Sequence, residues 1–201
     1  MALVNLRKAL NPITNKFEAI QKAKELYNKS ADINRVMLSE NFSTNLNKII
    51  NELDVKMNIE IMDLNDFHYG KNVSGILMQT SPDEYVIYVN QFDIKERRRF
   101  TIAHEIGHYV LGHLNKKDPK DFKYSYEDED FTLSYEKRDE NSSRGDVPKE
   151  IAANSFAAEI LMPEALTRYA YIMLGDHKQI ASLFVVSPEM ANIRLKSLGI
   201  I

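Results

Sequence analysis

The stretch RRFTIAHEIGHYVLGH, residues 98–113, contains one H-E-x-x-H unit and decides how the rest of the chain is interpreted. Residues four apart on a helix lie on the same face, so the imidazoles of His104 and His108 can bind one metal ion. Glu105 lies beside the first histidine and can reach a water on that ion as a base rather than as a ligand. The alternative is a half-buried helix face on which two histidines pack without a metal.

The composition limits the chemistry of such a site. The chain has 201 residues, of which 44% are hydrophobic, which is enough for one domain with a buried core. Its formal net charge of −3 gives no global basic field of the kind that favours nucleic acid. Cysteine is absent, which excludes disulfides, thiolate metal sites and cysteine nucleophiles. Any metal must therefore be held by imidazole and carboxylate groups.

No segment of the sequence indicates membrane insertion. The N-terminal residues lack the apolar core of a signal peptide, and no run approaches the roughly 18 apolar residues of a membrane-spanning helix. We therefore expect a soluble, cytoplasmic protein with no membrane partner.

Hydrophobic periodicity predicts helices, then strands, then helices, which is the order of an α+β fold. Residues 14–53 have helical spacing with a turn in the middle, and they belong to a predicted N-terminal helical segment, residues 1–54. Three segments with strand patterns follow and predict a small three-stranded sheet: residues 58–64, 73–79 and 84–90. The turn SPDE separates the last two, which predicts a hairpin.

The second half of the chain begins with the motif helix, which should end near Gly112. A long polar insertion follows at residues 115–146, and helix resumes at VPKEIAANSFAAEILMP, residues 147–163. Three shorter helices are predicted after it: residues 163–173, 176–184 and 188–198. We therefore expect a core over residues 55–172 and a C-terminal helical hairpin, residues 173–201, packed on that core.

A catalytic zinc site usually has three protein ligands, so the two histidines need a partner. Glu150 is one candidate, and Asn154 lies one turn further along the same helix face, where its amide can support the ligand. The other reading of Glu150 is a carboxylate favoured at a helix N-terminus. Glu159 is the rival ligand, in an apolar context where it can equally form an ion pair. His113 is excluded, because the extended H-E-x-x-H-x-x-G-x-x-H pattern requires glycine at position 111 and histidine at position 114, and both are leucine.

The tail IASLFVVSPEMANIRLKSLG, residues 180–199, could form a helix-turn-helix. After Lys178 its only basic residues are Arg194 and Lys196, which are too few for a phosphate-binding surface. Packing or protein docking is therefore favoured over DNA contact, and direct nucleic-acid binding is not expected.

The motif stretch followed by EIAANSFAAEILMP, residues 150–163, resembles the ImmA/IrrE family of metallopeptidases over residues 55–165. The resemblance implies a zincin-like core with an active-site H-E-x-x-H helix, and Zn²⁺ held by His104, His108 and Glu150. One departure is the separation of the ligand segments, 150 − 108 = 42 positions, which is longer than the family pattern and puts the shape of the substrate cleft in doubt.

A zinc-dependent endopeptidase is the expected function, and the resemblance implies Glu105 as its catalytic residue. Such a base takes a proton from water and delivers it to the leaving amine. The resemblance also implies a protein substrate, a helix-turn-helix repressor of the Xre type whose cleavage relieves transcriptional repression. A function of another class is a non-proteolytic anti-repressor with a structural zinc. A structural site usually has four protein ligands, which argues against that alternative.

Overall fold

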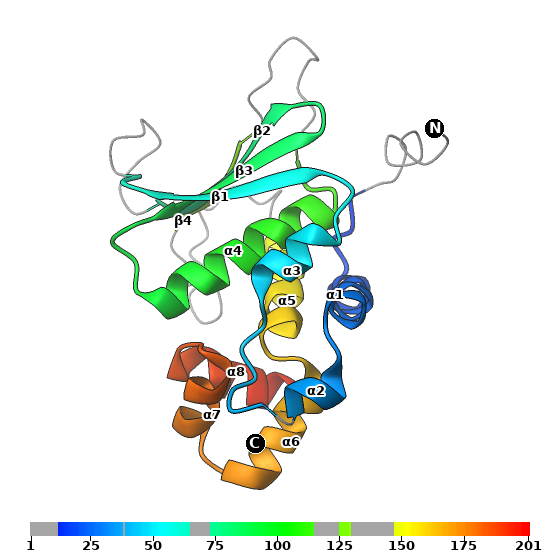
Figure 1. Ribbon diagram of the computed structural model, residues 1–201, viewed down its shortest axis with the longest axis vertical. Helices are drawn as coiled ribbons and strands as arrows, with labels where there is room; N and C mark the ends of the chain where they lie inside the picture. Colours follow the sequence, from blue (N-terminus) through cyan, green and yellow to red (C-terminus); the bar gives the residue numbers. More distant parts are fainter. Residues whose placement is uncertain (1–11, 38, 65–72, 115–124, 130–146) are drawn as a thin grey trace.

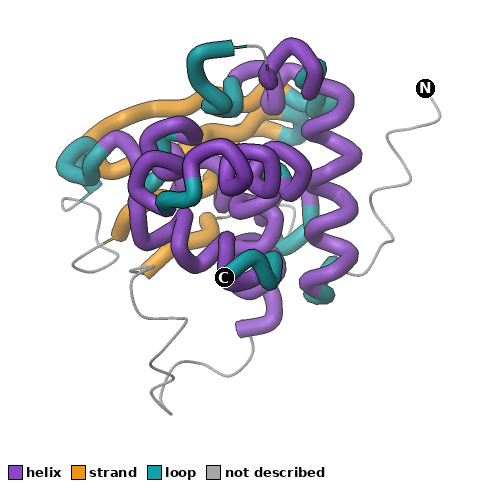
Figure 2. Tube along the Cα trace, turned by 90° about the horizontal axis from the view of Figure 1, so that it is seen from below, coloured by secondary structure: helices purple, strands orange, loops and turns teal. Residues whose placement is uncertain are grey.

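The structure is a computed structural model that describes residues 12–37, 39–64, 73–114, 125–129 and 147–201, and the fold is given for these residues. A β-sheet lies at one end of the molecule, a long helix crosses one of its faces, and further helices lie on the other side of that helix (Figure 1). The same layering is visible from below, where helices cover the strands (Figure 2). The α+β class predicted from the sequence is confirmed.

Three helices precede the sheet: α1 (Lys16–Ser30), α2 (Ile33–Met37) and α3 (Leu46–Asn51). The side chain of Asn15 caps α1 by accepting hydrogen bonds from the backbone N–H groups of Phe17 and Glu18. The buried face of α1 packs against α5 (Val147–Leu161). The N-terminal helices therefore form, as predicted, and α1 covers part of the core.

The sheet has four strands in the order β1-β3-β2-β4. Their bounds are β1 (Lys56–Met62), β2 (Val73–Ser81), β3 (Glu84–Asn90) and β4 (Ser125–Glu129). β2 and β3 form the predicted hairpin, with Met78 opposite Val86. β1 runs parallel to β3, with Ile59 opposite Ile87.

The three strands predicted from the sequence are all present, and β4 is a strand that was not predicted. It pairs antiparallel with β2 and comes from within the predicted polar insertion, residues 115–146. Its sequence SYEDE has no apolar alternation, and acidic residues are depleted in strands, so periodicity could not find it. The remainder of the insertion lies outside the described residues.

Helix α4 (Lys95–Val110) carries the H-E-x-x-H unit and lies between the sheet and α5. Gly107 lets the two helices approach closely. A Cβ atom at this position would lie 3.1 Å from the ring of Phe156 and 3.3 Å from the carbonyl oxygen of Ala153. Because α5 is rich in buried alanines, its backbone can meet the motif helix at the level of the two histidines.

Three helices follow α5: α6 (Glu164–Leu174), α7 (His177–Phe184) and α8 (Pro188–Ser197). Their bounds agree with the prediction within a residue or two. Ser187 caps α8 by accepting a hydrogen bond from the backbone N–H of Met190. Arg194 of α8 is buried and forms an ion pair with Glu159, which connects the C-terminal helices to α5.

One hydrophobic cluster joins these layers. It includes Leu26 of α1, Ile106 of α4, Phe156 of α5 and Leu195 of α8. The predicted boundaries at residues 54 and 172 stay predictions. Among the described residues, no helix is both long enough and apolar enough to cross a membrane.

Candidate metal centre

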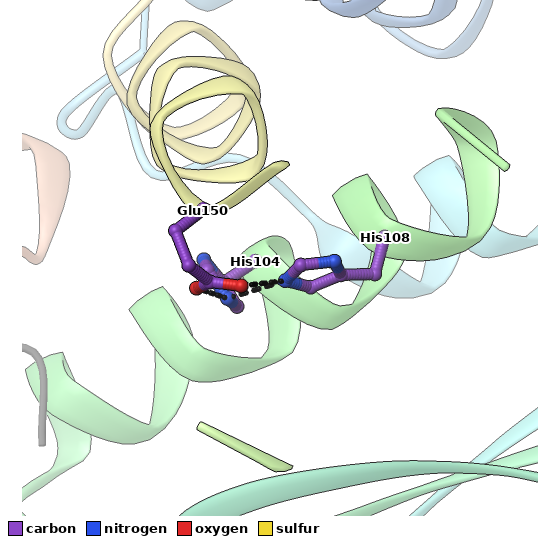
Figure 3. Close-up of side chains that lie close together, drawn as sticks. All are labelled: His104, His108 and Glu150. Carbon is purple, nitrogen blue, oxygen red and sulfur yellow. Dashed lines mark hydrogen bonds and ion pairs between the residues drawn. The ribbon is translucent and has the colours of Figure 1, made fainter. Parts of the chain in front are cut away.

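The side chains of His104 and His108 project from one face of α4 toward the first turn of α5, where Glu150 points back at them (Figure 3). The Nε2 atoms of the two histidines are 2.8 Å apart. The Glu150 carboxylate places Oε2 at 3.3 Å from Nε2 of His104 and Oε1 at 3.4 Å from Nε2 of His108. One donor atom from each of the three residues lies within 4.8 Å of the others, so the cluster could hold a metal ion.

Both histidines are fully buried, whereas the Glu150 side chain is 27% exposed. Burial lowers the pKa of His108 to about 3, so its imidazole is neutral at physiological pH. Burial acts to raise the pKa of Glu150, but its contacts with the two imidazoles outweigh that effect and lower the pKa to about 2. A neutral imidazole on His108 and an ionised carboxylate on Glu150 are the protonation states that a cation requires of these two ligands.

Glu105 is fully buried on the side of α4 that faces strand β2. A Cβ atom at Gly75 would lie 3.3 Å from Oε1 of Glu105 and 2.2 Å from Cγ2 of Thr101, one helical turn earlier. Glycine is therefore required at position 75 for α4 to lie this close to the strand. Glu105 is not among the three residues whose donor atoms converge, and it directly follows one of them, His104, in the chain.

The two carboxylates that the sequence offered as third ligand lie in different places. Glu150 faces the histidines, whereas Glu159 is buried near the end of α5. There it pairs with Arg194 and accepts a hydrogen bond from the backbone N–H of Glu164 at 3.2 Å. The apolar context of Glu159 in the sequence thus corresponds to a buried ion pair, one of the two possibilities that the sequence left open.

Asn154 follows Glu150 by one turn of α5, as the helical spacing requires. Its Oδ1 atom is buried and has no hydrogen-bond partner among the described residues. The supporting role expected for this amide stays a prediction.

Sequence reasoning excluded His113 as a ligand and found no other role for it. In the structure its Nδ1 lies 2.9 Å from Nδ1 of His108, and its Nε2 lies 2.6 Å from the carbonyl oxygen of Ile13. The sequence feature that could have revealed these contacts is Gly112, the residue directly before His113. Gly112 has a left-handed backbone (φ 73°) and ends α4 with hydrogen bonds that turn residue 113 back toward the helix.

Comparison with protein families supports the resemblance seen in the sequence. A family model described as Peptidase_M78, the IrrE N-terminal-like domain, matches residues 54–196, which is more than half of the chain. A search of curated proteins returned no match. The matched region contains α4 and α5, and with them the three converging side chains. The chain therefore belongs to the Peptidase_M78 family, whose members share the IrrE N-terminal-like domain.

Proposed function

We propose that this protein is a zinc-dependent endopeptidase whose substrate is a helix-turn-helix repressor of the Xre type. One observation carries the proposal: two imidazole nitrogens and a carboxylate converge within 4.8 Å, and the buried residue Glu105 directly follows His104 on the same helix. Membership of a peptidase family supports peptide-bond hydrolysis as the reaction.

The donor set fits zinc better than a hard cation such as Mg²⁺ or Ca²⁺, because two of its three members are imidazoles. His104, His108 and Glu150 would hold the ion, and three protein ligands leave a position open for water or substrate. Zinc, when bound, supplies a Lewis acid that makes water acidic near neutral pH and polarises a carbonyl group.

Glu105 is the proposed catalytic residue. Its carboxylate takes a proton from the attacking water and passes it to the amine that leaves when the peptide bond breaks. Full burial helps, because hydrogen bonds and charges act more strongly where water is excluded.

The substrate rests on the resemblance to the ImmA/IrrE family. Cleavage of the repressor would relieve transcriptional repression. Arg194 is buried and paired, so it cannot contact a phosphate, which argues against DNA binding by the C-terminal helices.

The competing function is an anti-repressor that binds the repressor without cutting it. Glu105→Gln distinguishes the two, because the amide keeps the size and polarity of the side chain but removes the base. The assay is a reporter gene controlled by an Xre-type repressor, run beside an immunoblot for repressor fragments. Glu52→Gln, at an exposed position after α3, is the matched control.

We expect Glu105→Gln to abolish fragments and keep the reporter repressed, while Glu52→Gln behaves like the wild type. General-base contributions are typically about 10²–10⁴-fold, so the loss should be complete in this assay. Full derepression by Glu105→Gln with intact repressor would exclude the peptidase mechanism and favour the anti-repressor.

A further inference from the structure

A chain of two hydrogen-bonding contacts leads from the N-terminal segment to the candidate metal centre. The backbone carbonyl of Ile13 lies 2.6 Å from Nε2 of His113, and Nδ1 of His113 lies 2.9 Å from Nδ1 of His108. The Nε2 atom of His108, across the ring, is the one that faces His104 and Glu150. His113 thus contacts His108 at Nδ1, the ring nitrogen that does not face the candidate metal centre.

The chemistry of the first contact decides where the protons lie. A backbone carbonyl can only accept, so Nε2 of His113 must carry a hydrogen and donate it to Ile13. A neutral imidazole has one N–H, so Nδ1 of His113 is then an acceptor. The hydrogen between the two rings therefore belongs to Nδ1 of His108, and its Nε2 is left with a lone pair.

The backbone holds His113 in this position from both sides. The N–H of His113 donates to the carbonyl of His108 at 2.9 Å, which closes the end of α4. The N–H of Ile13 donates to the carbonyl of Leu111, also at 2.9 Å. Since His113 is only 1% exposed, water cannot replace its partners without a rearrangement.

We propose that His113 is a positioning residue that fixes the tautomer of His108. The Ile13 carbonyl can only accept a hydrogen bond, and it therefore determines which nitrogen of each ring carries the hydrogen. His108 then presents the Nε2 lone pair that a metal ion needs. The proposal deepens the proposed function, since it concerns a ligand of the same site. It also gives the N-terminal segment a role, because Ile13 lies outside residues 54–196, the part that matches the family model.

Glu150 and His113 favour different tautomers of His108, so the proposal can be tested without metal. Glu150 lies 3.4 Å from Nε2 of His108 and, when no metal is bound, would favour a hydrogen on that atom. The two contacts from Ile13 through His113 to His108, called the relay below, favour the hydrogen on Nδ1 instead. The tautomer of His108 in the metal-free protein therefore reports which contact prevails.

The first measurement is a long-range ¹H–¹⁵N spectrum of the histidine rings in the chelator-treated full-length protein. The signals that disappear in the variant His108→Gln identify the ring of His108. We expect the Nδ1–H tautomer for His108 in the wild type. The Nε2–H tautomer in the wild type would overturn the proposal, whether or not the protein binds zinc or cuts a substrate.

The second measurement is zinc affinity by competition with a chromophoric chelator. His113→Phe keeps a ring but removes both nitrogens, and it should weaken zinc binding about 10- to 100-fold. His113→Gln can accept from His108 and donate to Ile13 through one amide, so it should recover most of that loss. The control is Thr167→Val, which removes buried hydrogen bonds to the carbonyls of Met162 and Pro163 far from the site.

The outcomes separate the two hypotheses. Unchanged affinity in His113→Phe, or equal losses in His113→Phe and His113→Gln, overturns the relay and leaves the peptidase proposal standing. A wild type that binds no zinc overturns the peptidase proposal, and the ring spectrum then decides the relay by itself. If His113→Phe does not fold, the wild-type spectrum and His113→Gln still give the answer.

Discussion

Oε2 of Glu150 lies 3.3 Å from Nε2 of His104, although 150 − 104 = 46 positions separate the two residues in the chain. The contact exists because the small residues of α5 and Gly107 of α4 let the two helices meet. It also defines which carboxylate is available to a metal ion.

Glu150→Gln should weaken zinc binding, because a neutral amide is a poorer zinc ligand than a carboxylate. Glu159→Gln should leave zinc stoichiometry at one per chain, since Glu159 faces Arg194 instead. Elemental analysis after zinc loading and dialysis measures both. The opposite pattern would mean that the third ligand is wrongly assigned.

Removing one partner of the buried ion pair should destabilise the fold strongly. Arg194→Met leaves the Glu159 carboxylate buried without its counter-charge, and such losses are typically about 3–5 kcal/mol. The double variant Arg194→Met/Glu159→Met should recover much of the stability, because no buried charge remains. Urea unfolding of the singles and the double forms a complete cycle. A double variant no more stable than Arg194→Met would contradict this account.

Gly75→Ala should destabilise the protein by about 1–3 kcal/mol, the usual range for overpacking. The added methyl group would meet Cγ2 of Thr101 and push α4, with Glu105, away from β2. Thr101→Ser removes that methyl group and keeps the hydroxyl, so the double variant should regain most of the loss. Urea midpoints of both singles and the double variant test this, and an additive double variant would show that the clash lies elsewhere.

The metal-free protein should lose stability as the pH falls below about 6.5. Burial lowers the pKa of His108 to about 3 in the folded state, so between these values the unfolded chain binds a proton that the folded protein does not. The free energy of unfolding should therefore fall with a slope approaching about 1.4 kcal/mol per pH unit from this residue. Burial also lowers the pKa of His113, which adds in the same direction.

Urea unfolding in chelator between pH 7 and 5 measures that slope. His108→Gln has no proton to gain and should show a shallower dependence. The carboxylate of Glu150, with its pKa of about 2, contributes only below about pH 4.5 and lies outside this window. A slope unchanged in His108→Gln would mean that His108 is not the source.

Most of the fold followed from local patterns. The β-branched and aromatic residues of EYVIYVN predicted β3, and Ser187 with Pro188 predicted the start of α8, because residue propensities and helix caps are properties of neighbouring residues. Strand β4 depends on pairing with β2, a contact between distant segments that SYEDE does not reveal by itself.

The candidate site divides in the same way. His104, Glu105 and His108 follow from spacing on a single helix, whereas choosing Glu150 over Glu159 requires the packing of α5 on α4. His113 was missed for a related reason. It lies past the end of the helix, so helical geometry places it off the face of His108, and only the reversal at Gly112 brings the ring back.

The spread of the site along the chain also bears on folding kinetics. Met78 and Val86 pair across a hairpin only 86 − 78 = 8 positions apart, whereas His108 and Glu150 meet across 42. Long-range contacts of this kind tend to form after local ones, so the donor set is expected to be incomplete in the folding transition state. Zinc should then slow unfolding while leaving the refolding rate nearly unchanged, which stopped-flow measurements with and without the metal would show. Bound metal would therefore stabilise the native state kinetically, by slowing its unfolding, and would not serve as a folding nucleus.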